Sequence, residues 1–137
     1  PRRTVEGYDK NRVEILSAVL SRSLKVDVNS KDIYINIPGG IDLNDRSSDL
    51  AVVFSLLSSI KGIPVSQKIA AIGELGLRGE VRKVSFIKNR VNELEKLGFV
   101  GVYLPKSHQA DFEKEKIKTK IKHNYISNIS ELVERIR

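Results

Sequence analysis

A serine and a lysine, Ser47 and Lys88, are the residues of this sequence whose types could perform nucleophilic chemistry together. A serine hydroxyl attacks a carbonyl carbon when a base removes its proton, and a neutral lysine in an apolar pocket can be that base. Ser47 lies at the start of a predicted helix, where backbone N–H groups can bind a developing oxyanion. The residue types therefore allow a peptidase. The spacing fits equally well a helix-capping serine and a surface lysine.

Other catalytic patterns are missing from the sequence. The 137 residues contain no cysteine, which excludes disulfides, thiolate chemistry and cysteine metal ligands. His108 and His123 stand far apart in polar surroundings, so we expect solvated loop residues and no metal site. Asp45 and Asp49 are expected to cap a helix rather than act as an acid and a base. No phosphate-binding glycine loop of the GxxxxGK[ST] form occurs, so no cofactor is expected in this segment.

Two predicted helices must position the serine and the lysine. Residues 48–60 are apolar nearly all round and follow several capping side chains, which predicts a buried helix beginning beside Ser47. Residues 85–97 carry an apolar stripe at helical spacing, which predicts a second helix with Lys88 at its start. Between them an apolar strand at 69–72 runs into three glycines. This density of glycines predicts a bent hairpin with positive φ angles or close backbone contacts, at Gly73, Gly76 and Gly79.

The remaining elements complete one α/β domain. An amphipathic helix is predicted at 9–24 and an alternating strand at 31–37. A strand at 99–104 should be parallel to another strand, because a helix precedes it. A last helix is predicted at 129–137.

The domain organisation is predicted to be simple. Residues 1–8 are expected to form an N-terminal arm or linker, and residues 9–137 a single domain. On the first helix, Arg12, Arg22 and Lys25 are expected to face solvent. No stretch of about 18 apolar residues exists, so no membrane span is predicted.

The net charge of +7 favours an anionic partner, of which nucleic acid is the commonest, although a lysine-rich solvated surface gives the same value. Residues 114–122 alternate lysine with other residues. As a strand they would form either a phosphate-binding stripe or an edge protected by lysines. Aromatic residues, 6% of the chain, are not interleaved with the basic runs, which argues against a base-stacking platform. The candidate phosphate contacts are Arg2, Arg3, Arg78, Arg82, Lys83, Lys114, Lys116, Lys118, Lys120 and Lys122.

Several motifs follow one another in the order and spacing of the Lon protease proteolytic domain. They are Ile35-x-x-Pro-Gly-Gly40, Lys61-Gly-Ile-Pro64, Gly73-Glu-x-x-Leu-Arg-Gly79 and Leu97-Gly-Phe-x-x-x-Tyr-Leu-Pro-Lys106. The chain resembles still more closely the Lon-like C-terminal domain of the bacterial RadA (Sms) DNA-repair family. That likeness lies in Pro1-Arg-Arg3, Asn11-Arg12, Ser48-Asp-Leu-Ala51, Gly73-Glu-x-Gly-Leu-x-Gly-Glu-Val81 and Arg90-Val-Asn-Glu93.

The resemblance implies a Lon protease-like α/β fold with a mixed sheet and packed helices. It also implies that residues 1–8 continue from an upstream ATPase that uses ATP and Mg, itself preceded by a zinc motif, both outside this segment. Proteins of this kind resemble cytoplasmic hexameric rings that act on DNA during recombination. The Lon pattern places Ser47 at the nucleophile and Lys88 at the base.

The sequence departs from the Lon pattern at this reactive corner. Lon surrounds its serine with Pro-Ser-Ala-Gly, whereas this chain has Arg46-Ser47-Ser48-Asp49, and Phe86-Ile87 replace glycines before the lysine. A carboxylate near the nucleophile would favour a charged lysine, the wrong form for a base. We therefore expect a degenerate dyad in a DNA-binding and oligomerisation scaffold of a RadA-like repair protein. The alternatives are a Ser47–Lys88 peptidase and a pure oligomerisation domain.

Overall fold

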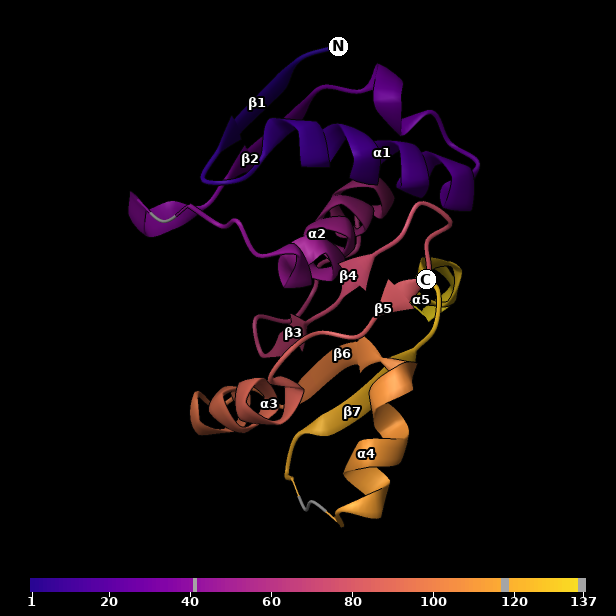
Figure 1. Cartoon of the computed structure of the whole chain (residues 1–137). Coiled ribbons are helices and arrows are strands. Elements are labelled where there is room, and N and C mark those ends of the chain that lie inside the picture. The colour runs from indigo at the N-terminus through magenta and orange to yellow at the C-terminus, as the bar shows by residue number, and fades with distance from the viewer. Residues whose placement is uncertain (41, 117–118, 136–137) are drawn as a thin grey trace.

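The structure, a computed structural model, describes residues 1–40, 42–116 and 119–135 and confirms the predicted α/β class (Figure 1). Its strands form three small sheets, two with parallel pairing and one antiparallel. The pairs are β1 (Arg3–Glu6) with β2 (Ile33–Asn36), β3 (Ile69–Ala71) with β6 (Gly101–Pro105), β6 with β7 (Lys122–Ile126), and β4 (Glu74–Leu75) with β5 (Val81–Arg82).

The helices lie at the four places where the sequence periodicity predicts them and at one further place, residues 109–114. They are α1 (Lys10–Leu24), α2 (Asp49–Lys61), α3 (Ile87–Lys96), α4 (Gln109–Lys114) and α5 (Ile129–Arg135). The Asp9 carboxylate caps α1 by accepting the Asn11 N–H at 2.9 Å. Gly98, with φ of 90°, follows the end of α3 as a stop signal should.

The strand β6 lies between the two hydrophobic cores of the domain. Along this strand, Tyr103 packs with the core formed by α1, α2 and α5, whereas Val102 and Leu104 are fully buried in the core beside α3 and α4. This alternation is the period of two that a strand imposes. Figure 1 shows α1 and α2 on one side of β6 and β7, and α3 and α4 on the other.

The N-terminal segment differs from its prediction. Residues 1–8, expected to be an arm or linker, contain β1, which pairs in parallel with β2 from Arg3 opposite Ile33 to Glu6 opposite Asn36. The burial of β1 alternates along its four residues, so the strand is half-covered by the domain. Four residues give too short an alternation to be distinguished from a loop without the partner strand.

The lysine-rich run at 114–122 is not the predicted strand. Lys114 ends α4, Lys116 has a positive φ of 48°, Lys120 lies in a bend, and Lys122 begins β7. Lys118 lies outside the described residues. The lysines therefore do not share one strand face, although β7 itself is at the edge of its sheet.

The glycine hairpin confirms its prediction by two different physical routes. At Gly79 φ is 81°, a conformation that glycine adopts without steric strain. A Cβ atom at Gly73 would lie 2.8 Å from a methyl group of Val81, and one at Gly76 would lie 2.0 Å from the Glu80 carboxylate. The chain therefore needs glycine here both for a turn and for close packing.

A buried ion pair joins α1, α2 and β4 behind this hairpin. The Arg12 guanidinium, predicted to face solvent, is instead buried and contacts the fully buried Asp49 carboxylate, with one hydrogen bond of 3.0 Å. Asp49 also accepts the Tyr8 hydroxyl at 2.8 Å and the Leu75 N–H at 3.1 Å, and Arg12 donates to the Leu75 carbonyl at 2.9 Å. Asp49 is thus the centre of a buried network and not a helix cap.

This network shifts the titration of its members. Burial and the hydrogen bond to Asp49 raise the pKa of Tyr8 to about 12. The same carboxylate raises the pKa of Arg12 further above its ordinary value. Tyr8 and Arg12 therefore both stay protonated at neutral pH.

Neither histidine is the solvated loop residue that the sequence suggested. His108 is 4% exposed, and its Nε2 accepts the Val84 N–H at 3.1 Å. His123 lies in β7, stacked edge-on against Phe112 and Tyr125. Burial is the main cause that lowers the pKa of both imidazoles. For His108 the nearby Lys83 lowers the pKa further and Asp111 opposes the shift.

The Arg12–Asp49 pair should be a major contributor to stability. Replacing Arg12→Met leaves an uncompensated buried carboxylate, so we expect the free energy of unfolding to fall by about 3–5 kcal/mol in urea titrations. The double variant R12M/D49L should be less destabilised than the sum of the single variants. Arg82→Met, which breaks an exposed contact with Glu80, is the control and should change stability by less than about 1 kcal/mol. Equal losses in both single arginine variants would contradict the assignment.

Acid should destabilise the fold through His108. Its folded pKa lies below the unfolded value of about 6.5, so the unfolded chain binds more protons as the pH falls. The stability from neutral His108 is complete above about pH 6.5 and is lost as the pH falls through the folded-state pKa. The His108→Gln variant should show a smaller slope of the free energy of unfolding against pH in this window. The His123→Gln variant should keep the part of the slope that comes from His108. An unchanged slope in the His108 variant would disprove this origin.

Candidate functional site

Ser47 lies in a short 3-10 helix, η3 (Arg46–Ser48), that leads directly into α2. Its side chain is buried, and its Oγ accepts a hydrogen bond of 2.8 Å from the Arg90 guanidinium. Arg90 also donates to the Asp45 carboxylate at 2.9 Å and to the Ser85 carbonyl at 2.9 Å. The partner of the serine is therefore an arginine from α3, which is a donor only and does not act as a proton acceptor in proteins.

The backbone N–H groups around Ser47 are already used within the protein. The Ser47 N–H donates to the Asp45 carboxylate at 2.9 Å, and the Ser48 N–H to the Asp45 carbonyl at 3.2 Å. The Asp49 N–H donates to the Arg46 carbonyl, and the Leu50 N–H to the Gly73 carbonyl at 3.0 Å. The predicted oxyanion donors are thus occupied. The bond from Ser47, with that from Arg90, lowers the pKa of Asp45.

Lys88 is present at the start of α3, as predicted, but has a different partner from the one that a dyad requires. Its Nζ forms an ion pair with Glu115 beyond the end of α4. An ammonium paired with a carboxylate is a charged donor, whereas a general base must be a neutral amine. No hydrogen bond joins Ser47 to Lys88 within the described part of the chain.

The role expected for Asp49 at this corner is also different. The sequence suggested that its carboxylate would act on the lysine base from two residues beyond Ser47. In the structure the carboxylate points into the core, where Arg12 neutralises it. The charge that acts on the serine is that of Arg90.

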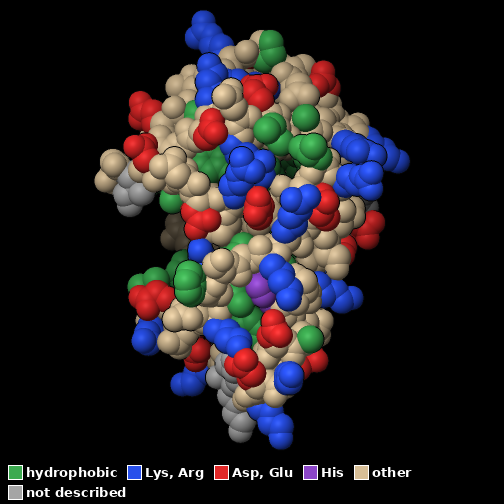
Figure 2. Space-filling view, viewed as in Figure 1, with side chains coloured by type: hydrophobic (Ala, Val, Ile, Leu, Met, Phe, Trp, Pro, Cys, Tyr) green, Lys and Arg blue, Asp and Glu red, His purple; other side chains and the backbone are tan. Residues whose placement is uncertain are grey.

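The basic candidates are exposed but do not converge on one site. Arg2 lies at β1, whereas Lys114, Lys116, Lys120 and Lys122 lie at the opposite end of the molecule in Figure 1. Arg78, Arg82 and Lys83 lie on and after the β4–β5 hairpin. On the face that Figure 2 shows, Lys and Arg side chains are distributed from end to end and alternate with Asp and Glu.

Arg3 is a structural residue. Its side chain is 6% exposed, and it forms an ion pair of 2.7 Å with Glu14. The guanidinium also donates to the carbonyls of Asn29, at 3.0 Å, and Lys31. It joins β1 to α1 and to the segment before β2, and it is therefore not placed to contact phosphate.

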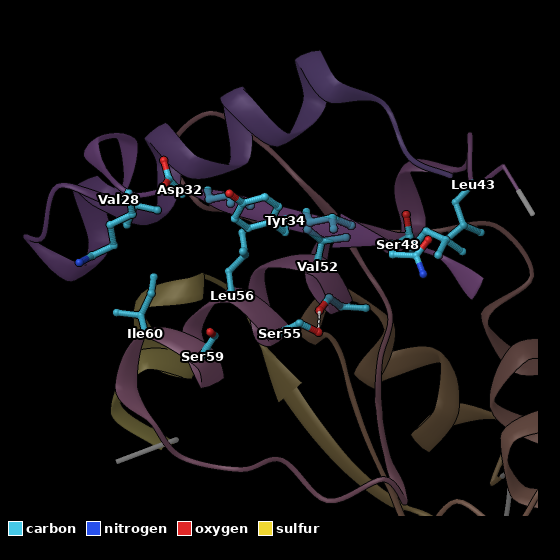
Figure 3. A pocket seen from close by; sticks show the side chains of 16 residues that line it. Val28, Asp32, Tyr34, Leu43, Ser48, Val52, Ser55, Leu56, Ser59 and Ile60 are labelled. Carbon is cyan, nitrogen blue, oxygen red and sulfur yellow. Dashed lines mark hydrogen bonds between the residues drawn. The ribbon is translucent and has the colours of Figure 1, made fainter. Parts of the chain in front are cut away.

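A groove of about 690 Å³ runs along β2 and α2, beginning beside Ser48 (Figure 3). Its apolar wall includes Val52, Leu56 and Ile60, and Figure 3 shows Leu56 extending toward Tyr34 of β2. The N–H groups of Ile33 and Ile37 bond to β1, so the backbone groups of Tyr34 point to the other edge, which no described strand covers. Such an open edge can accept an extended polypeptide.

Phe86 has an unusual backbone at the start of α3. Its φ of 60° and ψ of 36° lie in the left-handed region, which costs a non-glycine residue about 1–2 kcal/mol. This turn directs the chain from β5 into α3, and the Arg90 N–H bonds to the Phe86 carbonyl at 3.0 Å. The phenyl ring is 74% exposed. The left-handed turn thus places Arg90 against Ser47 and leaves the ring in solvent.

The described part of the chain has no cluster of metal ligands and no helix that could span a membrane. Within the described ranges, no three His, Cys, Asp or Glu side chains gather as they would around a metal ion. None of the helices described is long and apolar enough to cross a membrane.

Comparison with known proteins agrees with this architecture. The family model of the Lon protease (S16) C-terminal proteolytic domain matches residues 13–136. Proteins named DNA repair protein RadA are 43% identical over 106 residues in Streptococcus pyogenes, 40% over 116 in Bacillus subtilis and 35% over 134 in Helicobacter pylori.

These matches cover most of this chain and a small part of each relative. They span 77%, 85% and 98% of the chain, but only 23%, 25% and 28% of the three relatives. The chain therefore spans about a quarter of the length of the curated relatives it matches. The expected fold is confirmed, and the chain belongs to the family of the Lon protease (S16) C-terminal proteolytic domain.

Proposed function

We propose that this chain is a DNA-binding and oligomerisation scaffold of a RadA-like DNA repair protein, without peptidase activity. The similarity to proteins named DNA repair protein RadA supports the repair role. The observation that carries the non-catalytic role is the occupied corner at Ser47, whose hydroxyl is bound by Arg90. In this proposal the serine anchors α2 to α3.

The wider setting follows from the same proposal. The domain sits in a cytoplasmic ring of six copies, joined to an ATPase that uses ATP and Mg and to a zinc motif, both contributed by other parts of the protein. The positive net charge of +7 then serves to contact DNA phosphates without reading sequence. The exposed candidates for this contact are Arg2, Arg78, Arg82, Lys83, Lys114, Lys116, Lys120 and Lys122.

A Ser47–Lys88 peptidase is the alternative. The groove along β2 and α2 favours it, because it begins beside Ser48 and offers an open strand edge to an extended substrate. The ion pair of Lys88 with Glu115 opposes it, because that pair would have to break before the amine could accept a proton.

Peptidase activity is tested with fluorescent casein. We expect the chain and its Ser47→Ala variant to release fluorescence at the same rate as buffer, with an active Lon protease as the positive control. The double variant Arg90→Ala with Glu115→Gln, which frees both dyad residues, should be inactive too because the backbone donors at 47–50 remain occupied. Cleavage that disappears on Ser47→Ala would establish the peptidase instead.

DNA contact is tested by the salt dependence of binding to a labelled duplex, measured by fluorescence anisotropy. We expect weak, sequence-independent binding whose affinity falls steeply with salt, because bound phosphates release counterions. Arg78→Ala and Lys83→Ala should each reduce the slope of log affinity against log salt by about one. Arg22→Ala on α1 is the charge-matched control and should leave it unchanged. No binding at low salt would refute the proposed DNA contact.

A further inference from the structure

Phe86 is the most exposed large hydrophobic side chain in the part of the chain that the structure describes. A single exposed apolar residue is ordinary on a protein surface. This residue differs because its backbone also occupies the left-handed region, which bulky side chains rarely adopt. Glycine would give the same turn without strain, and the exposed ring contributes little packing to the folded chain. The exposed ring and the strained backbone together indicate that the ring contacts a partner outside the domain.

The surroundings of Phe86 carry unpaired positive charge. Lys83 and Lys106 are exposed, and neither forms an ion pair within the described ranges. The hydrogen bond from the Val84 N–H to His108 holds their two segments together. Phe86 is three positions after Lys83, so their Cα atoms lie within about 11 Å.

The other charges near Phe86 are already compensated. Lys88 is bound to Glu115, Arg90 to Asp45, and Arg82 contacts Glu80. Asp111, on the other side of His108, lies in the first turn of α4, where the positive end of the helix dipole offsets a carboxylate. The charge that remains for an external partner is therefore positive, which favours an anionic one.

We propose that Phe86 stacks on an unpaired base of single-stranded DNA while Lys83 and Lys106 contact the adjoining phosphates. This inference rests on the proposed DNA contact and names the form of DNA that the site takes. A single strand offers both the π face for the ring and the charge for the lysines. In a duplex the bases are stacked on one another, so an exposed phenyl ring has no face to contact.

The site also revises an expectation from the sequence. Composition argued against a stacking platform because no aromatic residue lies within a basic run. Folding brings the segment that carries Lys83 and Phe86 against the segment that carries Lys106 and His108, which is distant in sequence.

The test compares a labelled oligothymidine of about 16 nucleotides with a duplex by anisotropy, using the whole chain. Phe86→Leu keeps an apolar side chain but removes the π face, and it should weaken single-strand binding about tenfold while duplex binding stays unchanged. Phe86→Trp should bind the single strand at least as well as the original. Phe86→Gly relieves the backbone strain, so it should be folded and thermally more stable and still lose the same affinity. Leu97→Ala, at the exposed apolar position that follows the other end of α3, is the matched control and should change neither.

The outcomes separate this inference from the proposed function. If Phe86→Leu binds the single strand within twofold of the original, and duplex binding is intact, the stacking site is wrong and the DNA contact stands. If the variant changes only the sedimentation coefficient, the ring is an interface between copies, which also overturns the proposal. If the original chain binds neither DNA, both the stacking site and the DNA contact fail.

Discussion

The start of α2 and its contacts with α1 and β4 depend on one buried interaction, the pair formed by Arg12 and Asp49. A carboxylate with no solvent contact is stable only when its charge and its lone pairs are satisfied. Arg12 from α1, Tyr8 before α1 and the Leu75 backbone in β4 together do this. Because Asp49 is the first residue of α2, the network fixes the height and direction at which that helix begins.

This constraint determines what the reactive corner can do. Ser47 lies two residues before the anchored carboxylate, so it cannot shift without moving the start of α2. On its open side Arg90 holds the hydroxyl from α3. The Asp49 carboxylate is paired with Arg12 inside the core. The charged groups close to the serine are Arg90 and Asp45. Two arginines, one behind the helix start and one in front of it, are each paired with a carboxylate and keep the corner rigid.

Much of this arrangement could be predicted from the sequence because the signals are local. Helix α1 begins at its Asp9 cap and α3 ends before Gly98, both read from residue type alone. The parallel direction of β6 follows from the helix before it. The strand β1 was missed since four residues show no periodicity until β2 is beside them. The prediction for the lysine run was wrong because alternating residues share one face only if the chain is extended.

The long-range polar contacts could not be predicted. Sequence identifies Arg12 as a charge on a helix, but its burial depends on Asp49, which is 37 residues away. The helical spacing places Arg90 outside the apolar stripe of α3, so its contact with Ser47 could not be predicted from the sequence. His108 gave no signal, because its acceptor role depends on the Val84 N–H of another element.

Phe86 has the left-handed backbone conformation that glycine usually adopts. A left-handed turn at position 86 is required to direct α3 so that Arg90 reaches the serine, and this requirement holds whichever residue occupies the position. In a catalytic dyad, the strained backbone at Phe86 would serve to position Lys88 near Ser47. Here the Lys88 side chain instead forms an ion pair with Glu115. The turn therefore serves the inward contact through Arg90, and in our proposal it also presents the ring to DNA. A fixed backbone that presents an aromatic side chain to solvent close to Lys83 needs little rearrangement when a partner binds.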